Sequence, residues 1–164
     1  MDTQNKANIA YQPDHDHNHC IDSALEQAHQ LCKSRGQRLT QIRELVLQLI
    51  WQSHKPLGAY DLLPAIAEAG FNSAPPTVYR ALDFLQEQGL VHRLASLNAF
   101  IGCSHPGENH QGYFLICKLC GTTAELESSD LQQSILRCAS TAGFSVEQEN
   151  IEILGCCPNC QEAA

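Results

Sequence analysis

Apolar residues recur with a helical period in the first half of the chain. In residues 42–50 they fall at i, i+3, i+4, i+7 and i+8, directly after Thr40, a residue type that caps helices. Similar patterns predict helices over residues 22–36 and 59–69. Within the second of these, Pro64 removes one backbone hydrogen bond, so we expect a kink or an early 3₁₀ turn there.

A fourth helix is predicted to begin at Pro75 and Pro76, because proline suits a first helical turn, and to end at Gly89. One stripe of this helix is apolar and the opposite side is polar. The polar side consists of Tyr79, Arg80, Asp83 and Glu87. Residues 90–101 are typical of two short strands joined by a turn at residues 96–98. These elements together predict a winged helix-turn-helix.

After residue 102 the pattern changes. Residues 113–117 and 123–127 predict two strands, residues 130–142 predict a helix, and residues 144–154 alternate loosely as a further strand. The residues expected to face inward on this helix are Leu131, Ile135, Leu136, Cys138 and Ala139. The predicted fold class is α+β, a winged helix followed by a small α/β domain. The expected divisions are a disordered polar arm at 1–21, the winged helix at 22–101, a hinge loop at 102–112 and the α/β domain at 113–164.

The charge balance limits the partners that fit the chain. Its formal net charge is −8 and 17% of its residues are charged, which argues against a generally basic nucleic-acid binder and against an anionic membrane surface as a partner. Residues 29–98 nevertheless hold seven basic and five acidic residues, against two and eight in residues 99–164. A DNA contact would therefore have to be local and lie in the first half. Neither a secretory leader pattern nor an apolar run of about 20 residues is present, so we expect a cytoplasmic protein.

Nine cysteines in a reducing compartment indicate metal or redox chemistry rather than disulfides. The strongest pattern joins Cys117-x-x-Cys120 with Cys157-x-x-Cys160. Each such turn presents two thiolates on one side, and two turns fill the four positions of a tetrahedral zinc site. Because no position stays open, this predicted site is structural. Cys156 is an alternative to Cys157, and a redox dithiol is the rival interpretation.

A second group of metal-ligand residues is less strongly marked, although its imidazole, thiolate and carboxylate groups suit the borderline ion Zn²⁺. This group consists of His92, Cys103, His110 and Glu125. Alternative ligands in the same region are His105, Glu108 and Glu127. From spacing alone, a lone histidine on a strand is more often a surface residue or one hydrogen-bonded within the protein than a metal ligand. The polar arm adds a tract that either binds zinc weakly or is a solvated tail, and its residues are His15, His17, His19 and Cys20.

The start of the fourth helix offers a surface for reading DNA. Recognition helices contact bases from their N-terminal turns in the major groove. Here Arg80 could bond guanine bidentately, and Tyr79 could contact a thymine methyl or a phosphate, with Thr77 beside them. A solvated helix face is the alternative for an isolated Tyr-Arg pair.

Taken together, several motifs closely resemble the ferric uptake regulator family and, within it, the zinc uptake regulator branch. The motifs are Arg38–Arg43 (RLTQIR), Ala59–Leu63 (AYDLL), Pro76–Leu85 (PTVYRALDFL), Gly89–His92 (GLVH), Phe114–Gly121 (FLICKLCG) and Cys157–Cys160 (CPNC). The resemblance covers about residues 23–161. The chain departs from the family pattern in its histidine-containing arm, in Gly58 where a serine cap is usual, and in Pro64.

The resemblance implies a homodimer whose winged helix binds double-stranded operator DNA, with a C-terminal dimerisation domain and a corepressor metal at the hinge. Carried over by position, the hinge ligands are His92, Cys103, His110 and Glu125, and the cysteine distinguishes the zinc branch. We expect two zinc ions per protomer, one structural and one regulatory. The residues expected to contact DNA are Thr77, Tyr79, Arg80, Arg38, Thr40 and Arg43.

The expected function is zinc-responsive repression of zinc-uptake genes by a protein that is not an enzyme and takes no small organic substrate. Within the family, the alternative is an iron- or manganese-responsive regulator. Outside it, the alternatives are a hydrolase that uses the second zinc site and a zinc-storage or interaction protein.

Overall fold

The computed structural model describes residues 16–108 and 112–163. These residues form two compact units, one made of residues 16–108 and the other of residues 112–163. No helix within the described ranges is long and apolar enough to cross a membrane.

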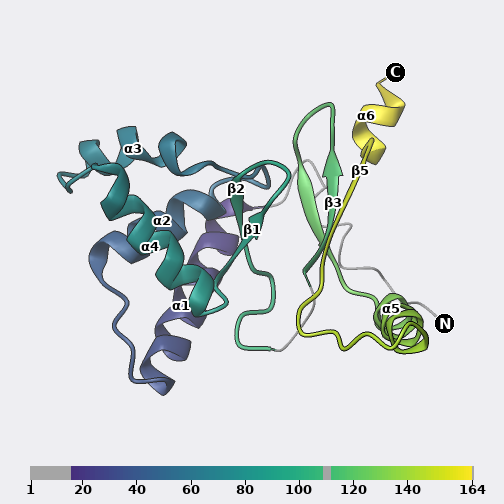
Figure 1. Cartoon of the computed structure of the whole chain (residues 1–164). Helices are drawn as coiled ribbons and strands as arrows, with labels where there is room; N and C mark the ends of the chain where they lie inside the picture. Colours follow the sequence, from purple (N-terminus) through teal and green to yellow (C-terminus); the bar gives the residue numbers. More distant parts are fainter. Residues whose placement is uncertain (1–15, 109–111, 164) are drawn as a thin grey trace. The chain divides into compact units, whose positions relative to one another are not determined.

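Four helices and a hairpin build the first unit (Figure 1). In chain order they are α1 (His17–Ser34), α2 (Gln41–Trp51), α3 (Ala59–Glu68), α4 (Pro75–Glu87), β1 (Val91–Leu94) and β2 (Ala99–Gly102). The two strands are antiparallel, with Val91 opposite Gly102 and Leu94 opposite Ala99. The turn between them contains Asn98 at a positive φ of 47°, a conformation that asparagine adopts more readily than most residues. The predicted winged helix is confirmed.

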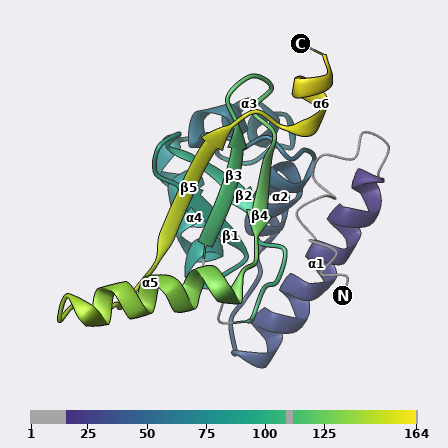
Figure 2. The ribbon, with the colours of Figure 1, turned by 90° about the vertical axis from the view of Figure 1, so that its right-hand side faces the viewer.

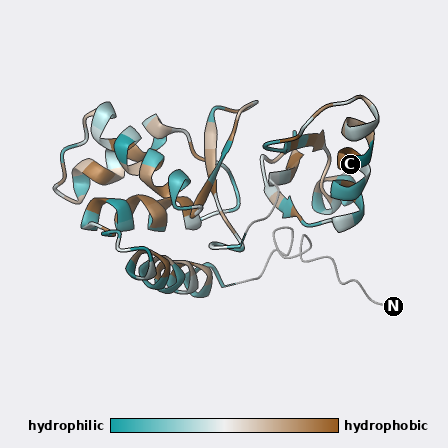
Figure 3. Ribbon diagram, turned by 60° about the horizontal axis from the view of Figure 1, so that its bottom comes forward, coloured by the Kyte–Doolittle hydropathy of each residue, from teal (hydrophilic) through white to brown (hydrophobic). Residues whose placement is uncertain are grey.

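The helices of the first unit pack through the apolar stripes that the sequence predicts. Val46 and Ile50 of α2 are buried against Val78, Leu82 and Leu85 of α4 in one core. Each such side chain contributes about 1.5–3 kcal/mol when it leaves water, so this core is the main source of stability for the unit. Figure 3 shows hydrophilic and hydrophobic residues interleaved along these helices, as expected for elements with one buried side.

Two contacts join the wing to the helices. Leu57, before α3, exchanges backbone hydrogen bonds with Phe100 of β2, at 3.0 Å from its nitrogen to the Phe100 oxygen and 2.8 Å in the other direction. Gly102, at the end of β2, lies against the ring of Trp51, the last residue of α2. A Cβ atom at position 102 would come within 2.2 Å of Trp51 Cε2, so only glycine fits this approach. The end of the wing is therefore fixed against the end of α2.

Two predictions for the first unit need correction. The first helix begins at His17 rather than at about residue 22, because the Asp16 side chain accepts a hydrogen bond from the Asn18 amide at 2.9 Å and caps the helix earlier. His17, His19 and Cys20 are thus helical and not part of a disordered arm, whereas His15 lies outside the described residues. Helix α3 also remains α-helical through Pro64, which lies on the exposed side, so the 3₁₀ turn expected as one of two outcomes does not form, whereas the kink stays a prediction.

The second unit is a three-stranded sheet with two helices (Figure 2). Its elements are β3 (Gly112–Cys117), β4 (Thr123–Leu126), α5 (Ser129–Thr141), β5 (Asn150–Gly155) and α6 (Pro158–Glu162). The strand order is β4-β3-β5, with β4 antiparallel and β5 parallel to β3. Helix α5 makes the crossover and runs across one end of the strands (Figure 2). Ser128 caps it by accepting a hydrogen bond from the Leu131 amide at 3.3 Å.

A buried polar pair fixes the start of this sheet. The Tyr113 hydroxyl donates a hydrogen bond to the Glu149 carboxylate, and both residues are buried. Desolvation, together with the Glu149 carboxylate, raises the pKa of Tyr113 to about 12. This hydrogen bond joins β3 to Glu149, the residue directly before β5. From there β3 and β5 run parallel, beginning with Gly112 opposite Asn150.

The predictions for the second unit fail in two places. The residues expected to face inward on α5 are not buried within the chain, and Leu136 is 41% exposed. Strand β5 begins at Asn150 rather than at residue 144, and Phe144 is 68% exposed. Periodicity identifies an apolar side but not what covers it, and the described residues leave this side of α5 only partly covered. The short helix α6 was not predicted.

Candidate metal centres and DNA-reading surface

The first cysteine pair lies in the turn that follows β3. The Cys117 amide donates a hydrogen bond to the Thr122 oxygen at 3.0 Å, and the Gly121 amide donates to the Cys117 oxygen at 2.9 Å. Gly121 has a φ of +77°, a conformation that glycine adopts without strain. The tight turn that results holds Cys117 and Cys120 close together.

The second cysteine pair reaches the same place through the parallel pairing of β5 with β3. Cys117 lies opposite Gly155, and the Lys118 amide donates a hydrogen bond to the Gly155 oxygen at 2.9 Å. The chain then turns at Cys157, the residue before α6. Pro158 begins this helix, and Cys160 lies in its first turn.

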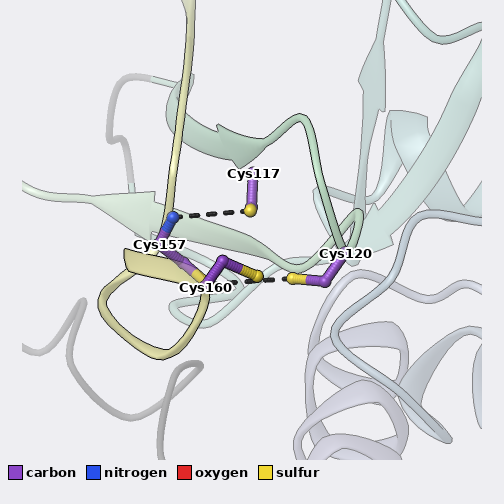
Figure 4. A group of neighbouring side chains, drawn as sticks. All are labelled: Cys117, Cys120, Cys157 and Cys160. Atoms are coloured by element: carbon purple, nitrogen blue, oxygen red, sulfur yellow. Dashed lines mark hydrogen bonds between the residues drawn. The ribbon is translucent and has the colours of Figure 1, made fainter. Parts of the chain in front are cut away.

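The four predicted structural ligands come together as one group (Figure 4). The sulfur atoms of Cys117, Cys120, Cys157 and Cys160 all lie within 4.8 Å of one another. Cys120 Sγ and Cys157 Sγ are 3.7 Å apart. Two thiolates bound to a tetrahedral zinc at about 2.3 Å have sulfurs about 3.8 Å apart, so this spacing fits Zn²⁺. Cys156, the alternative to Cys157, is not part of the group.

Hydrogen bonds at this group favour thiolate at two of its positions. Backbone amides, that of Cys120 first and that of Cys157 next, lower the pKa of Cys117, and the Cys157 nitrogen lies 3.4 Å from Cys117 Sγ. The Thr122 hydroxyl, 3.3 Å from Cys120 Sγ, lowers the pKa of Cys120. Thr122 was missed by sequence reasoning, although its position two residues after a C-x-x-C knuckle is a usable signal. Thiolate is the metal-binding form of cysteine, so the donor set suits a soft or borderline cation.

His92 and Cys103 form a second pair of metal-binding side chains within the first unit. His92 is on β1 opposite Ile101 of β2, and Cys103 follows two residues after Ile101. Side chains of opposed residues share one face of a sheet, as do residues two apart on a strand, so His92 and Cys103 are diagonal neighbours. The Cys103 amide donates a hydrogen bond to the Leu90 oxygen at 3.0 Å, which continues the hairpin. Their ligand atoms lie within 4.8 Å of each other, and Cys103 is buried.

The other predicted regulatory ligand that the structure describes, Glu125, belongs to the second unit. Glu125 is half-buried on β4, opposite Phe114 of β3, whereas Glu127 lies beyond the end of that strand and is exposed. His110 lies outside the described residues. Of the alternative ligands, His105 is half-buried and Glu108 is exposed.

Helix α4 presents the predicted DNA-reading residues at its N-terminal end. Tyr79 is 38% exposed, Arg80 is exposed and Thr77 is half-buried, while Val78 between them is fully buried in the core. Alternation of this kind directs the polar residues of the first two turns to solvent. Such an arrangement allows a helix to enter a major groove without disturbing its own packing.

The other three predicted DNA contacts lie before and at the start of α2. Arg38 is exposed, and Thr40 is the residue before the first turn, where its side chain makes no capping hydrogen bond. Arg43 is engaged within the unit. Its guanidinium lies 3.5 Å from the centre of the Phe84 ring and donates a hydrogen bond to the Arg38 oxygen at 2.6 Å. In this structure Arg43 therefore ties α2 to α4.

Comparison with known proteins agrees with this architecture. The sequence pattern of the Ferric uptake regulator family matches residues 34–154. The Zinc uptake regulation protein of Escherichia coli (strain K12) is 38% identical over 139 residues, which are 84% of this chain and 81% of that protein. A solved zinc uptake regulator complexed with zinc and DNA matches with a TM-score of 0.82 at 37% identity, over 87% of this chain and 96% of that one. The crystal structure of holo XcZur matches with a TM-score of 0.77 at 44% identity, over 87% and 99% of the two chains. The chain therefore belongs to the ferric uptake regulator family, which is made up of transcription regulators.

Proposed function

We propose that this protein is a zinc-responsive repressor that binds operator DNA as a homodimer and represses zinc-uptake genes in the cytoplasm. The observation that carries the proposal is the His92–Cys103 pair on the wing of a member of this family. Thiolate combined with imidazole selects zinc over the harder ions, because iron(II) and manganese(II) favour nitrogen and oxygen ligands. The similarity to regulators described as zinc uptake regulators supports the same metal.

Two zinc ions per protomer fit the ligands. Cys117, Cys120, Cys157 and Cys160 would hold the first in a closed shell, which leaves no position for substrate and gives the site a structural role. A shell of this type also supplies stability that a unit of about 50 residues lacks when its core is small.

The second ion would be held by His92, Cys103, His110 and Glu125. These residues belong to the wing, to the segment that follows it, and to β4 of the second unit. Zinc bound there supplies a link between the two units. The fraction of molecules with zinc in this site would then set the fraction whose two recognition helices are arranged as the operator requires. This is a population shift. A shell of four protein ligands leaves no water to activate, so we infer that the protein is not an enzyme.

Exposed apolar residues of the second unit support the proposed homodimer. The residues concerned are Leu136, Phe144, Ile153 and Leu154, whose exposed fractions are 41%, 68%, 41% and 58%. They come from α5, from the residues after it and from β5. Apolar side chains gathered on one small unit indicate a protein partner, and a second copy of the same unit is the simplest one.

A gel-shift experiment with Cys103→Ser tests the regulatory assignment. Wild-type protein should bind palindromic operator DNA only when zinc is present. Cys103→Ser should bind the same DNA weakly at every zinc concentration. Cys138→Ser, which replaces an exposed cysteine on α5, is the matched control and should behave as wild type. Wild-type, zinc-dependent binding by Cys103→Ser would refute the assignment.

Metal competition separates zinc from iron and manganese. With DNA binding as the readout, half-maximal activation should occur at a lower free concentration of Zn²⁺ than of Fe²⁺ or Mn²⁺. Activation by Fe²⁺ at the lower concentration would make the protein an iron sensor.

A further inference from the structure

One side chain joins the end of α1 to the end of α4. The Arg35 guanidinium donates a hydrogen bond from Nη1 to the Gln88 carbonyl oxygen at 2.9 Å, and the same nitrogen lies 3.4 Å from Gln88 Oε1. Gln88 caps the C-terminus of α4, and the last turn of α4, which the structure describes completely, holds no basic residue. A cation beside the last carbonyls of a helix is favourable, because these carbonyls form the negative end of the helix dipole. Arg35 therefore supplies from α1 the positive charge that α4 lacks at its end.

The same face of α1 also contacts the segment that follows the wing. Leu31 and Arg35 are four residues apart, so their side chains lie on one face of the helix. Gly107 has a φ of +87°, and a Cβ atom at this position would lie 3.1 Å from Leu31 Cδ1. This distance is shorter than an ordinary contact between carbon atoms, so the backbone at Gly107 approaches Leu31 closely. One face of α1 thus contacts both the end of α4 and a residue four positions after Cys103.

The turn after α4 holds the two proposed regulatory ligands of the first unit. The Leu90 amide donates a hydrogen bond to the Leu85 oxygen at 2.8 Å, and the Leu90 oxygen accepts one from the Cys103 amide at 3.0 Å. His92 follows Leu90 by two residues, on β1. Arg35 therefore bonds to the turn from which both ligands are placed.

We propose that Arg35 is a positioning residue for zinc-dependent binding of operator DNA. Together with Leu31, it holds the end of α4 and the segment that begins at Cys103 against one face of α1. Zinc that orders this segment thereby also orders the end of the recognition helix. The role requires no contact of Arg35 with the metal or with DNA. It rests on the proposed function and adds α1 to the elements through which the metal acts.

The coupling between zinc and DNA is the quantity that Arg35 controls. Zinc and operator DNA each raise the affinity of the protein for the other by the same factor, because linkage between two ligands is reciprocal. Loss of Arg35 reduces this factor and leaves the zinc affinity of DNA-free protein nearly unchanged. Loss of a direct DNA contact would instead weaken operator binding equally with and without zinc.

Operator affinity measured by fluorescence anisotropy tests the proposal on the full-length protein. Each variant is measured at saturating free zinc and with a chelator that leaves the four-cysteine site filled, and the ratio of the two affinities is taken. In Arg35→Ala this ratio should be about 3- to 10-fold smaller than in wild type, as expected when one hydrogen bond is removed. Arg35→Lys keeps a positive charge at the end of α4 and should recover part of the ratio. Lys33→Ala, which removes an exposed basic residue from the same turn of α1, is the matched control and should behave as wild type.

The outcomes separate this role from the proposed function. A ratio in Arg35→Ala equal to that of wild type, or an equal reduction in Lys33→Ala, would overturn the role of Arg35 while the protein remains a zinc-responsive regulator. A wild-type ratio near one would refute the zinc-responsive function and the role of Arg35 with it.

A pair of glycine variants tests the contact with Leu31. Gly107→Ala places a methyl group against Leu31 at a positive φ and should also reduce the affinity ratio. Gly70→Ala is the matched control, since Gly70 has a φ of +81° and no described atom within 4 Å of an added Cβ. Equal ratios in the two variants would refute the role of Leu31.

Hydrogen exchange followed by mass spectrometry provides a readout without DNA. In wild type, zinc added beyond the four-cysteine site should slow exchange of the amides in residues 86–90 and 103–108. In Arg35→Ala the slowing should be confined to residues 103–108. Equal slowing at residues 86–90 in both proteins, or none there in wild type, would refute transmission through Arg35.

Discussion

Gly102→Ala should disturb the wing without removing a metal ligand. The new Cβ would lie 2.2 Å from Trp51 Cε2, 2.5 Å from Nε1 and 2.6 Å from Cζ2. Ordinary carbon contacts begin near 3.5 Å, so the ring or the strand has to move by about 1 Å. Trp51 ends α2 and Gly102 ends β2, so this movement separates a helix from the wing. Overpacking of this kind typically costs about 1–3 kcal/mol in the free energy of unfolding.

The assay uses the protein's single tryptophan, which is Trp51 itself. Urea unfolding followed by its fluorescence reports on the first unit, and the midpoint should fall while the slope stays constant. Gly155→Ala, which lies in the second unit and is therefore followed by circular dichroism, is the control. It also ends a strand, has no atom within 4 Å of the added Cβ, and should leave stability within about 0.5 kcal/mol of wild type.

Two further measurements sharpen this prediction. Trp51→Leu makes room for the methyl group added at position 102. Adding Gly102→Ala to Trp51→Leu should therefore lower the free energy of unfolding less than adding it to wild type, as measured by urea unfolding followed by circular dichroism. Because Gly102 precedes Cys103, Gly102→Ala should also raise the zinc concentration needed for DNA binding. A Gly102→Ala protein as stable as Gly155→Ala would refute the reasoning from the close approach.

Three other substitutions have defined outcomes. Tyr113→Phe should lower the free energy of unfolding by about 1.5–3 kcal/mol near neutral pH, because the buried Glu149 carboxylate loses its donor. The folded-state pKa of Tyr113 is raised to about 12, so wild type should lose this advantage as the pH rises from about 10 toward 12, measured by urea unfolding. Cys160→Ser should abolish tight zinc binding and much of the circular dichroism of the second unit, while Trp51 fluorescence stays native. Arg80→Ala should weaken operator binding by about 10- to 100-fold in a gel shift, because an exposed arginine of the recognition helix is removed.

Each of these substitutions has a control in the same chain. Tyr60→Phe replaces a tyrosine that is 66% exposed and should leave stability unchanged. Cys138→Ser should keep full zinc content, and Arg137→Ala, on an exposed position of α5, should keep operator affinity. If a test variant behaves like its control, the role given to that residue is wrong.

Local patterns in the sequence predicted most of the elements. The helices over residues 42–50 and 75–87 follow from apolar spacing and from proline and glycine at their ends, and these signals act within a few residues. The two C-x-x-C knuckles are local for the same reason, since each turn forms from the residues it contains. What periodicity could not show was the partner of an apolar side, and α5 therefore lacks the cover that the pattern implied.

Contacts between distant segments were decided only by the tertiary structure. Parallel pairing of β3 with β5 brings Cys117 to Cys157, and the packing of the helices brings Arg35 of α1 to Gln88 at the end of α4. The approach of Trp51 to Gly102 and the bond from Tyr113 to Glu149 carry no mark in the sequence. Local propensity acts over one or two turns of chain, whereas these contacts depend on strand register and on how helices stack, which arise only when the whole unit packs.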